Sequence, residues 1–346
     1  MSDTIPVTIV GGGLAGLTLG IALRQCDVPV QVHEAGHYPR HRVCGEFISG
    51  HGQASLDRLG LRCMLDTAGA IQARTIAFFS SARSTGPRLL PVAGICLSRS
   101  ILDAVLAAGF RDLGGELVEG GRDTRGFGEG VVRATGRRAG ADADGMRWFG
   151  LKIHARHVAP VADLEMHVSP LGYVGLCRIN GGEVNVCGLF RKRVDRRAES
   201  IHWRELLRGQ SGSALWQRLA NADFDEESFC AVAGLCIQPQ RAGAREEICV
   251  GDAITLIPPV TGNGMSMAFE SAELAVGPLV AWSRGELSWN EAQQKIARDC
   301  DAIFNRRLAW ARWLQKIVLM PLLQDPLVAL AGRSDWVWRL AFNRTR

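Results

Sequence analysis

Three glycines near the start of the chain have the spacing of a phosphate-binding turn. Gly11, Gly13 and Gly16 form the pattern Gly-x-Gly-x-x-Gly directly after the apolar run Val7 to Val10. The first glycine permits a tight bend, the second lets the backbone approach a pyrophosphate, and the third lets a helix pack closely on a sheet. A helix that begins here would also direct its free N–H groups and partial positive charge at the phosphates.

An acidic residue completes this arrangement. Glu34 ends a second β-rich run, "VPVQVHE", about 20 residues after the turn, where a carboxylate can accept hydrogen bonds from ribose hydroxyls. A negative charge there disfavours a 2′-phosphate, so we do not expect the adenosine to come from NADP. Leu14 and Ala15 after the turn and Ala35 after the acid are expected to contact the same dinucleotide. This motif alone does not distinguish NAD from FAD.

A second glycine-rich turn lies far downstream, in "CVGDAITLIPPVTGNGMSM". We interpret it as an apolar strand that ends in Gly-Asp, followed by a proline-stiffened loop and a helix that begins near Met265. The aspartate could accept hydrogen bonds from ribityl hydroxyls, the glycines would admit a flat ring, and the helix N-terminus would favour negative charge on the reduced ring. Because FAD is long enough to need two distant contacts, this turn favours FAD. Its expected contacts are Gly251, Asp252, Pro259, Gly262, Asn263, Gly264 and Met265.

The bulk composition is that of a globular protein. The chain has 346 residues, 47% apolar and 22% charged, with a net charge of +5 and no concentrated basic run, so we expect no nucleic-acid partner. Its ten cysteines include no Cys-x-x-Cys pair, so we expect no metal site and read them as reduced thiols. No signal peptide or uninterrupted membrane span is recognisable, and we expect a cytoplasmic protein.

The order of the elements predicts an α/β fold. We expect a Rossmann-type FAD-binding domain with an inserted antiparallel-sheet substrate domain and C-terminal helices. The predicted boundaries are 1–150 together with 230–285 for the FAD-binding domain, 150–229 for the substrate-side sheet and 286–346 for the helices. Within the sheet region, Asn180-Gly181 predicts a hairpin.

Four stretches in the same order resemble one family of flavoproteins. They are "VGGGLAGLTLGIAL" with Glu34, "PRHRVCGEFISG", "LSRSILDAVL" and "VGDAITLIPPVTGNGMSMAFESAELA". They are similar to the FAD-dependent monooxygenases built like p-hydroxybenzoate hydroxylase, and above all to the branch of geranylgeranyl reductases and related bacterial flavin oxidoreductases. The likeness covers most of residues 5 to 280.

The resemblance implies further site residues. The segment from Pro39 to Gly50 would lie along the flavin, with Arg42, Cys44 and Gly45 as cofactor contacts, and Arg99 matches an arginine near the cofactor. Candidate catalytic residues are Cys44, Glu46 and His51, with Glu46 as an acid or base if it is buried. None is assigned as the general base.

The resemblance also implies the reaction. The reduced flavin would capture O₂ as a C4a-hydroperoxide, which would hydroxylate an aromatic, polyketide-like or otherwise apolar small molecule. No second Gly-x-Gly-x-x-Gly follows a strand, so NAD(P)H would bind transiently as reductant, or a separate partner would supply electrons.

Three alternatives remain open at this stage. Cys44-Gly45-Glu46 and the apolar C-terminus favour reduction of C=C bonds in a prenyl lipid. The hypothesis of a flavin halogenase is weakened because the Trp-x-Trp-x-Ile-Pro signature is absent from the sequence. The segment 106–149 is shorter than in the family, and Thr135 in "VVRATGRR" stands where an aspartate is common, which allows a flavin-binding partner protein with reduced activity.

The last part of the chain is rich in Trp and Leu. It predicts helices from about Trp289 whose apolar residues either pack internally, accept a greasy substrate or touch a membrane surface. The sequence leaves the oligomeric state open.

Overall fold

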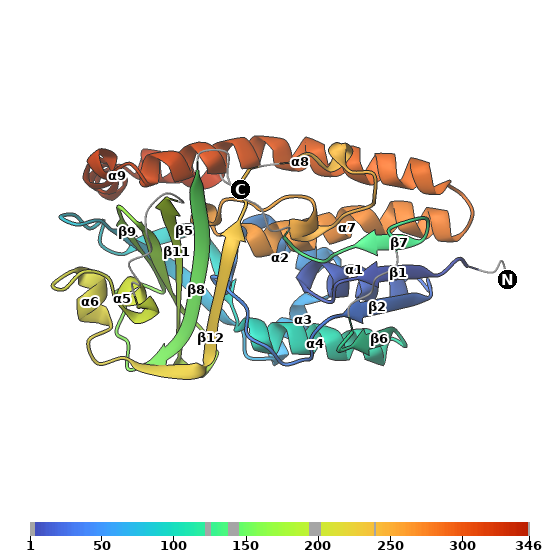
Figure 1. Cartoon of the computed structure of the whole chain (residues 1–346), viewed down its shortest axis with the longest axis horizontal. Coiled ribbons are helices and arrows are strands. Elements are labelled where there is room, and N and C mark those ends of the chain that lie inside the picture. The colour runs from blue at the N-terminus through green and yellow to red at the C-terminus, as the bar shows by residue number, and fades with distance from the viewer. Residues whose placement is uncertain (1–3, 122–125, 138–144, 194–201, 239, 345–346) are drawn as a thin grey trace.

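Two sheets form the frame of the protein (Figure 1). The computed structural model describes residues 4–121, 126–137, 145–193, 202–238 and 240–344. In Figure 1 the smaller sheet lies at the right, beside the N-terminus, and the larger sheet lies at the left. One long helix, α8 (Trp289–Val318), runs along both sheets.

The smaller sheet contains four parallel strands in the order β6-β2-β1-β7. These strands are β1 (Val7–Val10), β2 (Val30–Glu34), β6 (Glu116–Glu119) and β7 (Val131–Arg133). Strands β1 and β2 are joined by α1 (Leu14–Arg24), which is buried over almost its whole length, as expected for a helix covered on more than one side. The predicted strand–turn–helix–strand unit is therefore confirmed.

The larger sheet contains eight strands in the order β12-β8-β11-β10-β9-β4-β5-β3. Among the described residues, β4 and β9 are its only parallel pair. The strands are β3 (Phe47–Ile48), β4 (Ile71–Phe79), β5 (Arg88–Cys96), β8 (Met146–Arg156), β9 (Leu164–Ser169), β10 (Gly172–Arg178), β11 (Val184–Arg193) and β12 (Asp223–Leu235).

The predicted hairpin at Asn180-Gly181 connects β10 to β11. Gly181 and Gly182 both have positive φ values, 72° and 75°, which only glycine adopts at little cost and which suit a tight reversal between antiparallel strands. The predicted α/β class, with a Rossmann-type sheet, an antiparallel region and C-terminal helices, is confirmed.

One sheet crosses a predicted domain boundary, and one predicted strand needs correction. Strands β3, β4 and β5 belong to the larger sheet, although the predicted boundary places residues 1–150 in the FAD-binding domain, because β4 pairs with β9 and extends that sheet. The apolar run before Gly251 makes only an isolated bridge, Cys249 to Arg133, because the short β7 offers few partners. The division into domains remains a prediction.

Helices cover both sheets. The remaining ones are α2 (Gly50–Arg58), α3 (Arg62–Thr67), α4 (Arg99–Asp112), α5 (Trp203–Arg208), α6 (Ala214–Arg218), α7 (Gly264–Ser283), α9 (Pro321–Arg333) and α10 (Asp335–Arg344). The predicted C-terminal helices are confirmed, and α8 begins with a capping box between Ser288 and Glu291. No single helix among the described residues is long and apolar enough to span a bilayer, although α8 and α9, bent by 111°, meet those criteria as a pair.

Candidate functional site

A continuous cavity of about 1320 Å³ connects the two sheets. One end lies at the first glycine turn and the end of β2, its middle lies at the second glycine turn, and its far end lies between the larger sheet and helices α9 and α10. Pockets for a single drug-sized ligand span roughly 300–1,000 Å³, so this cavity has room for a dinucleotide and a second small molecule.

The three glycines of the first turn have different structural roles. Gly11 has a φ of 114°, and a Cβ atom there would lie 2.2 Å from the carbonyl oxygen of Ala134. A Cβ atom on Gly16 would lie 1.9 Å from the carbonyl oxygen of Gly11, so Gly16 serves the packing of α1 and does not line the cavity. Gly13 has no atom within 4 Å of its Cβ position, and it faces the open cavity.

The N-terminus of α1 is open to a ligand. Gly13 is its N-cap, its first turn contains no acid, and no side chain in the described part of the chain caps it. Leu14 and Ala15 line the cavity beside it. The free N–H groups and the helix dipole therefore suit a phosphate at this end.

Glu34 lies at the end of β2 and is buried. Its two carboxylate oxygens accept hydrogen bonds from the N–H groups of Gly12 (2.9 Å) and Gly36 (3.0 Å). Arg40 forms an ion pair with Glu34 at 2.6 Å, and Arg42 approaches the same oxygen at 3.5 Å. The predicted ribose-binding acid thus lies at the cavity together with Ala35, and Arg40 is an additional cation that the sequence interpretation missed.

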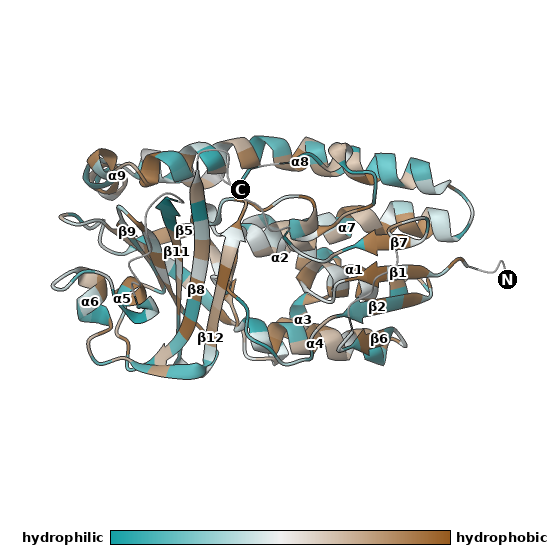
Figure 2. Cartoon of the chain, viewed as in Figure 1, coloured by the Kyte–Doolittle hydropathy of each residue, from teal (hydrophilic) through white to brown (hydrophobic). Residues whose placement is uncertain are grey.

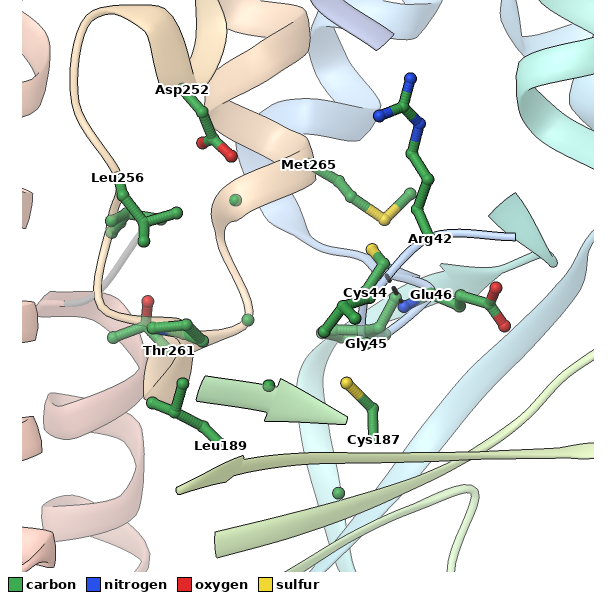
Figure 3. A pocket seen from close by; sticks show the side chains of 18 of the residues that line it. Arg42, Cys44, Gly45, Glu46, Cys187, Leu189, Asp252, Leu256, Thr261 and Met265 are labelled. Atoms are coloured by element: carbon green, nitrogen blue, oxygen red, sulfur yellow. Dashed lines mark hydrogen bonds between the residues drawn. The ribbon is translucent and has the colours of Figure 1, made fainter. Parts of the chain in front are cut away.

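The segment from Arg42 to Glu46 crosses the middle of the cavity (Figure 3). Arg42 lies 3.3 Å from Asp103, which also pairs with Arg99 at 2.9 Å, so α4 anchors both arginines. Burial raises the pKa of the Cys44 thiol, although the charge of Arg99 opposes this, and the thiol stays protonated at neutral pH. Gly45 has open space at its Cβ position.

The second glycine turn faces this segment across the cavity, with Asp252, Thr261 and Met265 on its side in Figure 3. Burial raises the pKa of Asp252 to about 6. Gly262 has a φ of 65°, and α7 begins at Gly264 without a side-chain cap. Gly251 and Pro259 also line the cavity.

Asn263 is the one predicted member of this turn that does not line the cavity. It is buried, and its Oδ1 accepts a hydrogen bond from the hydroxyl of Ser49 at 2.8 Å. It therefore ties the turn to the segment before α2. The residues present fit FAD, because two uncapped helix N-termini and two open glycine positions, Gly13 and Gly45, line one continuous cavity.

Glu46 lines the cavity, and its carboxylate lies in a buried network. Its carboxylate accepts hydrogen bonds from the backbone N–H of Arg99 (2.8 Å) and from Nε2 of His154 (2.8 Å), and Nζ of Lys152 lies 3.5 Å away. Burial alone would raise the pKa of Glu46, but the bond from His154 and the charge of Lys152 outweigh it and lower the pKa. Glu46 is therefore a carboxylate at neutral pH, which does not suit a proton donor.

The histidines that line the cavity are His33 and His41, and the predicted His51 is not among them. His51 is exposed on α2 and does not line the cavity. His41 lines it, with Nδ1 3.0 Å from Nζ of Lys152. Burial lowers the pKa of His41, and the charges of Lys152 and His154 lower it further. In the stretch "RHRVC" the family resemblance identified Arg42 as a candidate, and no sequence pattern identified His41.

The far end of the cavity is apolar. Its walls come from β4, β5, β9, β10 and β11 on one side and from the C-terminal helices on the other. Apolar side chains that line it include Ile76, Phe78, Leu90, Leu164, Met166, Leu189, Leu314, Val318, Leu327, Val328, Trp338 and Phe342.

Tyr173 places a polar group on this wall. Its side chain is buried and lines the cavity, and its hydroxyl has no hydrogen-bond partner among the described residues. Because an unpaired buried hydroxyl is costly, this atom is placed to bond a ligand.

The loop after β7 also lines the cavity, from Ala134 to Arg137. Strand β7 pairs in parallel with β1, so "VVRATGRR" does extend the nucleotide-binding sheet. Burial lowers the pKa of Arg137 at the cavity, and the charge of Asp252 opposes the effect. Within the shortened segment, residues 122–125 and 138–144 lie outside the described residues.

Comparisons with known proteins agree with this geometry. No protein-family model matches the chain. Menaquinone reductase of Mycolicibacterium smegmatis (strain ATCC 700084 / mc(2)155) is 24% identical over 390 residues, which cover 99% of this chain and 91% of that protein.

Solved structures extend the likeness over the whole chain. The flavin-dependent brominase Bmp2 has a TM-score of 0.74 at 15% identity, with 98% of this chain and 92% of that chain covered. The p-nitrophenol 4-monooxygenase PnpA from Pseudomonas putida DLL-E4 has a TM-score of 0.74 at 16% identity, with 100% and 99% covered. PqsL of P. aeruginosa, in complex with 2-aminobenzoylacetate, has a TM-score of 0.70 at 17% identity, with 94% and 99% covered.

These structures share the arrangement of the chain from end to end, and they include flavin-dependent enzymes of more than one reaction type. The resemblance predicted from the four sequence stretches is thereby confirmed at the level of the fold: the chain has the fold of the flavin-dependent monooxygenases and halogenases.

Proposed function

We propose that the protein is an FAD-dependent oxidoreductase that acts on an apolar or aromatic small molecule, with oxygenation of that molecule as the first candidate reaction. The observation that carries this proposal is the cavity of about 1320 Å³, which joins the phosphate-binding turn to the apolar far end of the cavity, called the apolar chamber below. A nicotinamide dinucleotide alone would leave the second glycine turn and the apolar chamber without a ligand.

The residues of the chain have separate tasks in this proposal. The N–H groups at the start of α1 hold the pyrophosphate, and Glu34 holds the adenosine ribose. Asp252 accepts hydrogen bonds from the ribityl chain, and the N-terminus of α7 offers positive potential to the ring. When bound, FAD supplies two-electron redox chemistry and, once reduced, reactivity toward O₂.

The apolar chamber excludes water and orients the substrate. Apolar side chains from α8, α9 and α10 close it, and the unpartnered hydroxyl of Tyr173 bonds a polar group of the substrate. His41 presents an imidazole at the same cavity, so it can hold or release a proton there. We expect NAD(P)H to act as a transient reductant, since its own binding fold is not evident in the described residues.

The first experiment is purification followed by an absorption spectrum and reconstitution with FAD. We expect a yellow protein, or an apoprotein that takes up one FAD per chain. A colourless protein that does not bind FAD would refute the proposal at its base.

A second candidate reaction is the reduction of a prenyl or quinone-type lipid. The similarity to menaquinone reductase of Mycolicibacterium smegmatis, which covers 99% of this chain, favours this reaction. Cys44-Gly45-Glu46, which crosses the middle of the cavity, was the sequence feature that suggested it.

Turnover with and without oxygen separates the two reactions. An oxygenase consumes O₂ in step with the oxidation of NAD(P)H and product formation, whereas a reductase converts its substrate under anaerobic conditions with a chemically reduced flavin. Rapid reoxidation in air with no substrate-dependent product under either condition would instead indicate a flavin-binding protein with reduced activity.

A further inference from the structure

The outer surface at the junction of α8, α9 and α10 carries large exposed apolar side chains. Leu322 is 90% exposed, Trp336 71% and Trp313 54%. Met320 and Leu323, also exposed, lie next to Leu322 at the start of α9. In Figure 2 the colour of α8 changes from mainly hydrophilic in its N-terminal half to increasingly hydrophobic as it approaches α9. Exposed apolar residues gathered in this way mark an interaction surface.

The same surface is basic. Residues 306–344 contain seven Arg or Lys and two Asp, a surplus equal to the net charge of +5 of the whole chain. Six of these bases are exposed and, among the described residues, form no ion pair with an acid: Arg306, Arg312, Lys316, Arg333, Arg339 and Arg344.

The two aspartates interact with other parts of the chain. Asp325 accepts hydrogen bonds from the hydroxyl of Ser80 and the N–H of Ala82. Asp335 pairs with Arg88. The exposed positive charge of this surface is therefore not compensated locally.

Apolar and basic residues alternate along one face of α8. Ile303, Arg306, Trp313 and Lys316 follow one another at intervals that keep them on one side of α8, and all are exposed. Tryptophan and leucine beside arginine and lysine on a surface helix is the pattern that binds the interface of a membrane.

The helices under this surface also form the wall of the apolar chamber. Leu327 and Val328 of α9 and Trp338 of α10 line the cavity. Leu330 does both, since it lines the cavity and is 49% exposed. Only one layer of helix thus separates the far end of the chamber from the exposed surface.

We propose that this surface docks onto a lipid bilayer that contains anionic headgroups, so that α9 and α10 form the passage between the bilayer and the chamber. Anionic lipids complement the uncompensated bases, and the apolar side chains enter the interface. A symmetric contact with a second copy is disfavoured, because it would bring the exposed bases of the two copies together. The proposal rests on the proposed function for the identity of the substrate, which would be an apolar molecule taken from the bilayer.

The test is sedimentation of the purified protein, with its flavin, in the presence of vesicles. Vesicles of phosphatidylglycerol mixed with phosphatidylcholine are compared with vesicles of phosphatidylcholine alone. We expect strong binding to the anionic vesicles, weak binding to the neutral ones, and a decrease as salt is added. Each exposed base that contacts the surface should contribute roughly fivefold in partitioning.

Matched variants locate the contact. Leu322→Glu and Trp313→Glu should each reduce binding to anionic vesicles about tenfold or more. The controls are Leu113→Glu directly after α4 and Trp216→Glu on α6, which exchange the same exposed residue types away from this surface and should bind like the original protein.

The outcomes are separable from those for the proposed function. Absent binding to anionic vesicles, equal loss in the control variants, or an oligomer that Leu322→Glu dissociates would each overturn the membrane proposal, even if the protein is yellow. A protein that binds vesicles but never binds FAD would overturn the proposed function and leave the docking surface intact. Circular dichroism of each variant establishes that it is folded.

Discussion

Nζ of Lys152 lies 3.0 Å from Nδ1 of His41, and the lysine side chain is fully buried behind the cavity wall. Since an ammonium group only donates hydrogen bonds, Nδ1 of His41 must accept, and the proton of the neutral imidazole resides on Nε2. A strand of the larger sheet thereby selects the tautomer of a residue in the loop that lines the cavity. His41 is consequently able to donate from Nε2 to a ligand in its neutral form.

This pair predicts the titration of His41. Its pKa is lowered by burial and by the charges of Lys152 and His154, so the ring should remain neutral at pH values below the usual 6.5. Nitrogen NMR of labelled protein should show the Nε2–H tautomer at neutral pH. Observation of Nδ1–H, or a titration above 6.5, would contradict the assignment.

A second prediction concerns Glu46 and Lys152. Loss of the Glu46 charge in Glu46→Gln leaves the buried ammonium of Lys152 without its carboxylate, which should lower the free energy of unfolding by about 3–5 kcal/mol. Adding Lys152→Met removes the unpaired charge and should recover a large part of that loss. Urea unfolding of the two single variants and the double variant measures this coupling, and additive losses would show that the two groups are energetically independent.

The first glycine turn predicts two different failures. A side chain at Gly13 would enter open cavity, so Gly13→Val should keep the stability of the apoprotein and lose the bound flavin. A side chain at Gly16 would collide with the backbone of Gly11, so Gly16→Val should destabilise the fold itself, by roughly 1–3 kcal/mol or more. Flavin absorbance and thermal unfolding of the apoproteins distinguish the two effects; stoichiometric flavin in Gly13→Val would speak against a phosphate at this turn.

The raised pKa of Asp252 predicts a pH dependence. Burial raises it from 3.8 to about 6, so the folded apoprotein binds this proton more tightly than the unfolded chain between those two values. The cost of the buried charge is present above pH 6 and is relieved as the pH falls toward 4, by at most about 3 kcal/mol. Asp252→Asn should therefore be more stabilising, relative to the original chain, at pH 7 than at pH 4.5. Urea titrations of both apoproteins at the two pH values check this, and an unchanged difference would mean that Asp252 titrates normally.

Tyr173 predicts a variant that gains stability and loses affinity. Its buried hydroxyl has no partner among the described residues, so Tyr173→Phe should raise the free energy of unfolding by about 1 kcal/mol and leave the flavin content unchanged. Binding of a substrate with a polar group should weaken by roughly 2- to 10-fold, the value of one neutral hydrogen bond. A marked loss of stability would indicate a structural role for the hydroxyl.

The glycine turns were recognisable because each depends on local features of the chain. At the first turn, a short buried strand, a glycine pattern, a helix and Glu34 follow one another within one βαβ unit, and backbone geometry imposes that order. The same holds for the hairpin at Gly181, whose positive φ value only a glycine adopts readily. In contrast, the run before Gly251 had the composition of a strand, but pairing partners decide whether a strand forms, and it found only a bridge to Arg133.

The sequence by itself therefore determined the fold class, the two glycine turns and most of the residues beside them. The tertiary structure alone decided that Lys152 approaches His41, that Glu46 faces His154, and that Asn263 turns to Ser49. The partners in these pairs lie more than a hundred residues apart, so their meeting depends on how β8 and α7 pack against the loop before α2. No local periodicity records such a contact, because side-chain pairs of this kind arise from sheet register and packing between distant segments.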